Sequence, residues 1–318
     1  MMKMRTRLLV GFVAAITLSV VLIGVWRAWS KADPPKFVVM KDLPYVPGTL
    51  DPFQYLDLYL PSAPSLPTLA LKGSAPATLP ANPVIVWVHG GAWMAGDKNH
   101  PEAVGSMIKR GYAVASINYR LTNRFTHPAQ INDCKAAVRY LRANAQKYGL
   151  DPNRIGVWGT SAGGHLAALL GTSGDVKELE GDLGNNEFSS RVQAVVDWCG
   201  PTDLVSIAAQ AKPNSKIDFR APGNPVHALM GTTAAPASYL AASPVQYVSK
   251  DDPPILVIHA KDDDVVPFEQ SVEFIDLLKK IGVEVEGVIP SGGGHALSSK
   301  RYVEQSLDFF DKHLGAKK

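Results

Sequence analysis

Short apolar runs alternate with amphipathic, helix-like segments along most of this chain. Continuous apolar runs that are bounded by turn residues are typical of strands buried on both faces of a parallel sheet. The predicted strands are residues 54–60, 84–88, 112–117, 154–158, 192–198, 255–258 and 283–289.

Helical spacing of apolar residues fills the intervals between these runs. Glycine follows several of the intervals, as expected at helix ends. Strands that alternate with helices predict an α/β fold, with a mainly parallel sheet covered by helices on both faces. The predicted helices are residues 102–110, 129–148, 164–170, 268–280 and 300–314.

Three segments lack this periodicity. Residues 33–48 contain prolines and are interpreted as a lead-in, and residues 61–83 are rich in Pro, Ser, Ala and Thr, which predicts a surface loop. Residues 203–247 are rich in Ala, Pro, Ser and Asn. We interpret this last segment as an insertion of short helices over one edge of the sheet.

The composition is that of a globular protein. Its 318 residues are 46% hydrophobic and 19% charged, enough for one large α/β domain or two small ones. The formal charge is +3, but residues 1–32 hold five lysines and arginines and no acid, so the rest carries −2, that is, +3 less 5. A nearly neutral body without a basic block does not predict nucleic-acid binding.

Residues 1–32 are predicted to be a targeting element. Three basic residues precede an uncharged run of 19 residues, 8–26. This run is longer than the core of most cleaved signal peptides and close to the ~20 residues that span a bilayer. Both a signal anchor and a signal peptide cut near residues 30–32 remain open, with the anchor favoured. Either one places residues 33–318, the predicted catalytic domain, outside the cytoplasm.

The two cysteines, Cys134 and Cys199, form neither a disulfide framework nor a metal-binding spacing. Cys134 lies in a helical pattern and Cys199 at the end of an apolar strand. We interpret both as small buried apolar residues.

The most informative motif is Gly-Thr-Ser-Ala-Gly at residues 159–163, between a predicted strand and a predicted helix. In this setting a sharp turn exposes the central serine, here Ser161, above the sheet. The start of the helix also favours a negative charge beside that serine. The motif alone predicts a nucleophile no better than it predicts a glycine-rich turn.

Candidate groups follow three other strands, where the chemistry of such sheets is usually found. His-Gly-Gly-Ala-Trp at residues 89–93 matches an oxyanion loop, which predicts oxyanion contacts from the backbone N–H groups of Gly91, Ala92 and Ala162. One of the three aspartates at residues 262–264 could orient an imidazole, and His295 in a glycine-rich loop could act as the general base. His89 and His165 are interpreted as bracing residues.

The order serine, aspartate, histidine is that of α/β-hydrolases. The chain resembles the α/β-hydrolase carboxylesterases, in a subgroup with feruloyl and acetyl-xylan esterase members that is related to hormone-sensitive-lipase-like enzymes. The resemblance covers about residues 40–315 and rests on residues 87–93, 118–121, 133–137, 159–165, 200–203, 243–245 and 258–267.

The resemblance implies an α/β-hydrolase fold with residues 203–247 as a cap-like insertion after the sixth strand. It implies Asp263 as the catalytic acid and His295 as the base, although Ala260 stands where the family usually has glycine. The expected activity is hydrolysis of short-chain or carbohydrate-linked acyl esters by a Ser-His-Asp mechanism that needs no cofactor or metal. Amidase, peptidase or arylformamidase-like activity with the same triad, and a non-catalytic binding module, are the alternatives.

Overall fold

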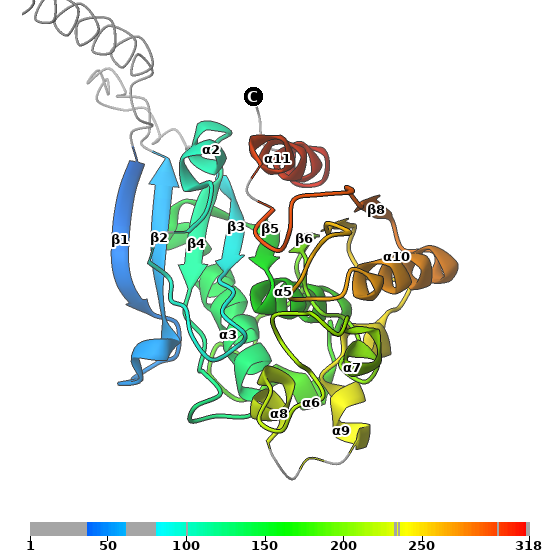
Figure 1. The fold of residues 1–318 in the computed structure, drawn as a ribbon. Helices are drawn as coiled ribbons and strands as arrows, with labels where there is room; N and C mark the ends of the chain where they lie inside the picture. The colour runs from blue at the N-terminus through cyan, green and yellow to red at the C-terminus, as the bar shows by residue number, and fades with distance from the viewer. Residues whose placement is uncertain are drawn as a thin grey trace, which may run out of the picture. The chain divides into compact units, whose positions relative to one another are not determined.

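The computed structural model describes residues 37–61, 81–99, 101–231, 234, 236–297 and 299–315. Residues from Phe37 onward form one compact unit, drawn in colour in Figure 1. The predicted targeting element, its apolar run at residues 8–26 and most of the loop predicted at 61–83 lie outside the described residues. Among the described helices, none has both the length and the apolar character needed to cross a membrane.

Eight strands of the described residues form one sheet in the order β1-β2-β4-β3-β5-β6-β7-β8. Strand β2 pairs antiparallel with both β1 and β4, and the pairs from β4 to β8 are parallel. The mainly parallel sheet predicted from the apolar runs is therefore confirmed. The strands are β1 (Phe37–Pro44), β2 (Tyr55–Pro61), β3 (Asn82–Val88), β4 (Ala113–Ile117), β5 (Leu150–Thr160), β6 (Ala194–Trp198), β7 (Ile255–Ile258) and β8 (Val285–Val288).

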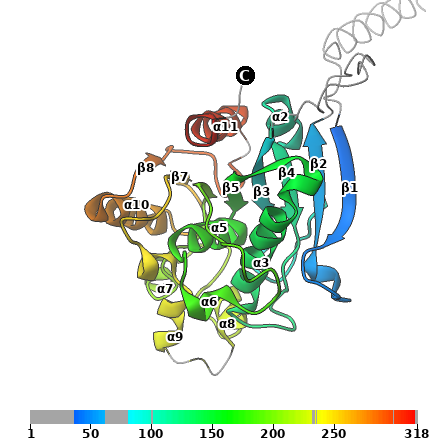
Figure 2. The ribbon, with the colours of Figure 1, turned by 180° about the vertical axis from the view of Figure 1, so that it is seen from behind.

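Helices cover both faces of this sheet (Figures 1 and 2). Alternate residues of β3 show how: Val84 and Val86 pack toward α3, α5 and α10, whereas Ile85 packs toward α2 and α11. Burial on both sides explains why the strand is apolar throughout. The helices are α2 (Val104–Lys109), α3 (Ala129–Ala143), α4 (Ala145–Tyr148), α5 (Ala162–Thr172), α6 (Lys177–Glu180), α7 (Ile207–Gln210), α8 (Pro225–Met230), α9 (Pro236–Ala241), α10 (Glu269–Ile281) and α11 (Lys300–Leu314), with 3-10 turns η1 (Pro52–Gln54) and η2 (Pro244–Tyr247).

Two sequence-based predictions were wrong in detail. The lead-in at 33–48 contains β1, an edge strand whose antiparallel pairing shifts register between Met40 and Leu43. An edge strand tolerates a terminal proline such as Pro44. The prolines of this segment therefore do not exclude a strand. The single helix predicted at 129–148 is broken at Asn144, whose side chain donates to the carbonyl of Tyr140 at 2.9 Å. Local bonding of this kind competes with helix continuation.

The segment at 203–247 follows β6 and contains α7, α8, α9 and η2. This agrees with the predicted insertion of short helices after the sixth strand.

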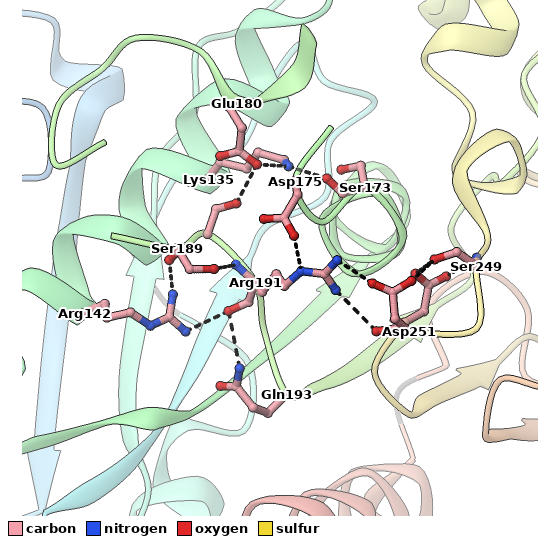
Figure 3. Close-up of polar contacts among 12 residues, drawn as sticks. Lys135, Arg142, Ser173, Asp175, Glu180, Ser189, Arg191, Gln193, Ser249 and Asp251 are labelled. Atoms are coloured by element: carbon pink, nitrogen blue, oxygen red, sulfur yellow. Dashed lines mark hydrogen bonds and ion pairs between the residues drawn. The ribbon is translucent and has the colours of Figure 1, made fainter. Parts of the chain in front are cut away.

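Polar contacts fasten the connection between α5 and β6 to its neighbours (Figure 3). Arg191 pairs with Asp175 at 2.8 Å and with Asp251 at 2.5 Å. Arg142 on α3 donates to the backbone carbonyls of Ser189 and Arg191. Individual exposed ion pairs contribute little, about 0–1 kcal/mol, so this network orients the loops more than it stabilises the domain.

A buried lysine ties the long loop after β3 to the antiparallel edge of the sheet. The Lys98 ammonium, 7% exposed, lies 2.8 Å from a carboxylate oxygen of Asp42 and 2.8 Å from one of Asp57. Its backbone N–H donates to the Asn118 side chain at 2.6 Å, and its carbonyl accepts from Ser116 at 2.8 Å. Burial alone would lower the pKa of Lys98, but the two carboxylates outweigh it and raise that pKa.

We expect Lys98→Met to destabilise the domain by about 3 kcal/mol, because it leaves the buried carboxylate of Asp57 without its cation. Urea unfolding followed by circular dichroism measures this change. The matched control is Lys312→Met, which removes an exposed pair with Glu284 and Glu286 and should change the stability far less, because solvent screens exposed pairs. Equal effects of the two substitutions would contradict the prediction.

Candidate active site

Ser161 occupies a sharp turn between β5 and α5. Its backbone has φ 59° and ψ −122°, a conformation that non-glycine residues rarely adopt. The flanking glycines are required by space, since a Cβ on Gly159 would overlap the carbonyl of Gly163, and one on Gly163 would overlap the carbonyl of Val88. The motif at 159–163 therefore forms a strained turn that holds the hydroxyl at one place, at a cost of about 1–3 kcal/mol.

The structure brings together three predicted site residues from three strand ends. The Ser161 hydroxyl donates to Nε2 of His295 at 2.9 Å. Nδ1 of His295 donates to Oδ2 of Asp263 at 2.8 Å. A hydroxyl, an imidazole and a carboxylate joined in this order can activate the hydroxyl as a nucleophile.

Asp263 is the inward-facing member of the three aspartates. It is 2% exposed, and its Oδ1 accepts the backbone N–H groups of Val265 at 2.8 Å and Val266 at 3.0 Å. Burial would raise the pKa of Asp263, but hydrogen bonds from His259 and His295 outweigh it and hold that pKa well below its usual value. The carboxylate therefore stays ionised beside His295 across the physiological range.

His259 is a second partner of this carboxylate, which sequence reasoning missed. Its Nε2 lies 3.0 Å from Oδ2 of Asp263 and 3.1 Å from the carbonyl of Val266. Both partners are acceptors, so Nε2 carries the proton, while Nδ1 accepts from the Ser271 hydroxyl at 2.7 Å. A signal was present in the sequence, because this histidine directly follows the apolar run at 255–258 and precedes Asp263 by four residues.

The predicted oxyanion groups lie around Ser161. Gly91 and Ala92 line the same cleft as Ser161 and His295, and Ala162 follows Ser161 at the start of α5. Gly91 has φ 107° and Ala92 φ 55°, and a Cβ on Gly91 would overlap the carbonyl of Ala95. The positive φ and the lack of space for a Cβ explain why residue 91 is a glycine.

Two histidines brace this loop, as the sequence analysis predicted. His165 accepts from the Trp93 indole at 3.1 Å and lies 2.8 Å from the carbonyl of Ala242, to which Nε2 donates. Burial lowers the pKa of His165 to about 4, so it is neutral. His89 stacks on Tyr119 with ring centroids 4.3 Å apart and lies 2.7 Å from the carbonyl of Gly90.

Both cysteines are buried and free, which agrees with their interpretation as small core residues. Cys134 lies within the α3 core. Cys199 lies beside the site, where its thiol donates to the carbonyl of His295 at 3.4 Å. Burial raises the pKa of the Cys199 thiol well above its usual value, so it is not a thiolate nucleophile.

Ser161 opens onto two spaces of unequal size. A cleft of about 560 Å³ is lined by the 89–92 loop, by His295 and by apolar residues that include Trp87 and Ile217, with Asp97 and Glu102 as acidic residues. A second pocket, of about 20 Å³, borders Ser161 and Ala162 and is almost entirely apolar. The cleft has room for a large polar group and the pocket for a small apolar one.

A buried carboxylate lies close to this site but is not part of it. Asp197 on β6 is fully buried, and its Oδ1 accepts the N–H of Gly200 at 2.9 Å. Its Oδ2 has no hydrogen-bond partner among the described residues. Burial raises the pKa of Asp197 to about 6, in spite of the N–H of Gly200.

Comparison with known proteins supports the relationship that the motifs indicate. The family described as BD-FAE matches residues 74–278. The probable carboxylic ester hydrolase LipM of Mycobacterium tuberculosis is 33% identical over 223 residues, which are 68% of this chain. This chain spans about half of that relative, 47% of its length.

Solved structures of similar proteins share the fold. A truncated carbohydrate esterase from gut microbiota superimposes with a TM-score of 0.75 at 33% identity, and the match covers 89% of this chain and 99% of that one. An acetyl ester-xyloside bifunctional hydrolase from Caldicellulosiruptor lactoaceticus gives a TM-score of 0.62 at 26% identity, covering 89% and 95%. The predicted α/β-hydrolase fold is confirmed.

We expect Asp197→Asn to become relatively more stable than the parent as pH rises from 4 to 8. The pKa of the Asp197 carboxyl is about 6 in the folded protein, against its usual value of 3.8, so the folded state binds this proton more tightly. The parent protein therefore loses stability as pH rises from 3.8 to about 6, and the variant does not. The gain of the variant should approach about 3 kcal/mol. Urea unfolding at each pH measures it, with the exposed Glu187→Gln as control; a pH-independent difference would refute the prediction.

Proposed function

The chain belongs to the BD-FAE family, and on this premise we propose that it is a serine carboxylic-ester hydrolase with Ser161 as its nucleophile. The observation that carries the proposal is the unbroken hydrogen-bond chain from Ser161 through His295 to Asp263. The resemblance to carboxylic ester hydrolases and carbohydrate esterases favours esters as the substrate class.

In the first half of the reaction, Oγ of Ser161 attacks the ester carbonyl and passes its proton to Nε2 of His295. The carbonyl oxygen becomes an oxyanion, which accepts from the backbone N–H groups of Gly91, Ala92 and Ala162. The ionised Asp263 stabilises the imidazolium that forms. When the ester C–O bond breaks, His295 returns its proton to the leaving alcohol, and the acyl group stays on Ser161.

In the second half, water attacks the acyl-enzyme and gives a proton to His295. The bond between the acyl carbon and Oγ of Ser161 then breaks, and His295 protonates Oγ. The carboxylic acid leaves, and the site returns to its starting state. The proposed reaction uses no cofactor and no metal.

The shape of the site supports short-chain or carbohydrate-linked acyl esters as substrates. The 20 Å³ pocket suits a short acyl chain, and the cleft of about 560 Å³ with the acidic residues Asp97 and Glu102 suits an alcohol with hydroxyl groups. Amidase, peptidase and arylformamidase-like hydrolases use the same triad, but the similar proteins are esterases. A binding module would not need the aligned serine, histidine and aspartate.

Residues 1–32 are proposed to export the catalytic domain, residues 33–318, and to anchor it in a membrane. The proposal rests on the basic residues before the uncharged run at 8–26. In this arrangement the ester substrate meets the enzyme outside the cytoplasm.

We expect Ser161→Ala to lower kcat on p-nitrophenyl acetate by about 10⁶-fold, because the nucleophile is lost. The variant should also lose covalent labelling by a fluorophosphonate. The control is Ser291→Ala, an exposed serine on the loop that carries His295, which should keep both. Retention of most activity or of labelling by Ser161→Ala would show that another residue is the nucleophile.

We expect the full chain to sediment with membranes and to be cut by protease added to spheroplasts, in which the outer face of the cytoplasmic membrane is accessible. Deletion of residues 1–32 should leave active enzyme in the soluble cytoplasmic fraction, because the export signal is gone. N-terminal sequencing separates an anchor, which is intact, from a signal peptide cut near residue 32. Uncut protein in the cytoplasmic fraction would refute both forms of the proposal.

A further inference from the structure

The small pocket beside Ser161 has room for about one methyl group. Its volume of about 20 Å³ slightly exceeds the ~10–15 Å³ needed for one water on the same measure. Apolar side chains make most of its wall, so a methyl group is favoured there over a water molecule. The lining residues are Ala92, Trp93, Ser161, Ala162, Pro201, Ile217, Phe219, Pro225, Val265 and Val266.

His295 determines which part of an ester enters which space. The leaving alcohol must lie against the group that protonates it, and His295 lines the large cleft but not the small pocket. The alcohol therefore occupies the cleft. The acyl group points the other way, past Ala92 and Ala162, into the pocket.

A third space lies behind the acyl pocket, within the insertion at 203–247. It is a mainly apolar cavity of about 270 Å³ that is partly open to solvent and far larger than the acyl pocket. Its lining residues are Leu204, Val205, Ile207, Ala208, Phe219, Asn224, Val226, His227, Ala234 and Tyr239.

Phe219 lines both the acyl pocket and this cavity. Its side chain is 6% exposed, so it is packed between the two spaces. The buried Asn224 fixes its backbone, because Nδ2 of Asn224 donates to the carbonyl of Phe219 at 2.8 Å while Oδ1 accepts from the N–H of Val226 at 2.9 Å. The wall continues at the start of α8, where Pro225 faces the pocket and Val226 the cavity.

We propose that Phe219 is a specificity-determining residue that restricts the acyl group to about the size of acetyl. The Phe219 ring separates the cavity from the acyl pocket, and removal of the ring would let a longer acyl chain extend into the cavity. This inference rests on the proposed esterase function. It adds the residue that limits the length of the acyl group.

The test is the acyl-chain profile of kcat/KM on p-nitrophenyl acetate, butyrate, hexanoate and octanoate. The parent enzyme should prefer acetate, and its activity should fall steeply with chain length. Phe219→Ala joins the pocket to the cavity, so the ratio of hexanoate to acetate should rise by at least about tenfold, as one methylene alone discriminates by that factor in an apolar pocket.

A second-site variant controls for general loosening of the site. Ala208 lines the cavity but not the acyl pocket. Adding Ala208→Phe to Phe219→Ala refills the cavity and should return the hexanoate-to-acetate ratio toward that of the parent. Ala208→Phe alone should leave the parent's profile unchanged.

Rates are normalised to the fraction of each variant that a fluorophosphonate labels, so misfolded protein does not enter the ratio. If Phe219→Ala does not fold, Phe219→Leu should give a smaller shift in the same direction. The parent alone also tests the proposal, since a methylphosphonate should inactivate it far faster than a hexylphosphonate with the same leaving group.

Two failures are distinguishable. A parent that hydrolyses none of the esters and is not labelled refutes the proposed esterase function. An active parent whose chain-length profile is flat, or is unchanged in a labelled Phe219 variant, refutes the role of Phe219 alone.

Discussion

The close approach of the turn after β5 to the end of β3 is the constraint on which the site depends. No side chain fits at Gly159 or Gly163, because the carbonyls of Gly163 and Val88 occupy the places where a Cβ would lie. This contact forces Ser161 to a positive φ and fixes its hydroxyl. It also sets the start of α5, and so the N–H of Ala162, against the loop that follows β3. The proposed nucleophile and the proposed oxyanion groups are thus placed by one packing contact, before any ligand is bound.

Asp263 fixes the position of His295, the proposed base. It accepts four hydrogen bonds, two from backbone N–H groups and two from His259 and His295. The neighbouring Asp262 accepts from the N–H groups of Gly293 at 3.3 Å and Gly294 at 2.8 Å, which holds the glycine-rich loop in place. The glycines before His295 are therefore compatible with a defined position of its imidazole, since hydrogen bonds to Asp262 hold their backbone in place.

Much of this arrangement could be predicted from the sequence, and the exceptions have physical reasons. The central strands are buried on both faces, so their apolar runs predict strands clearly. The edge strand β1 carries the exposed residues Lys41 and Asp42, so its sequence is interpreted as a lead-in without regular structure. Residue chemistry could not choose among the aspartates at 262–264. Their surroundings separate them, since Asp262 holds the glycine loop, Asp264 pairs with Lys216 at 3.0 Å, and Asp263 faces inward. The position of His259 after an apolar run was a signal in the sequence, but its contacts with Asp263 and Ser271 are created only by the fold.

The division between strand ends and insertion explains how acyl selectivity can differ while the chemistry is kept. The proposed triad belongs to the loops after β5, β7 and β8, but Ile217 and Phe219 in the proposed acyl pocket belong to the insertion. These two parts are joined next to the catalytic acid, because the N–H of Lys216 donates to the carbonyl of Asp264 at 2.7 Å. The pocket wall is therefore held in register with Asp263 by the backbone. A change at the Phe219 side chain would alter the volume beside Ser161 without breaking that link, so the proposed acyl pocket can change while the hydrogen bonds of Asp263 are kept.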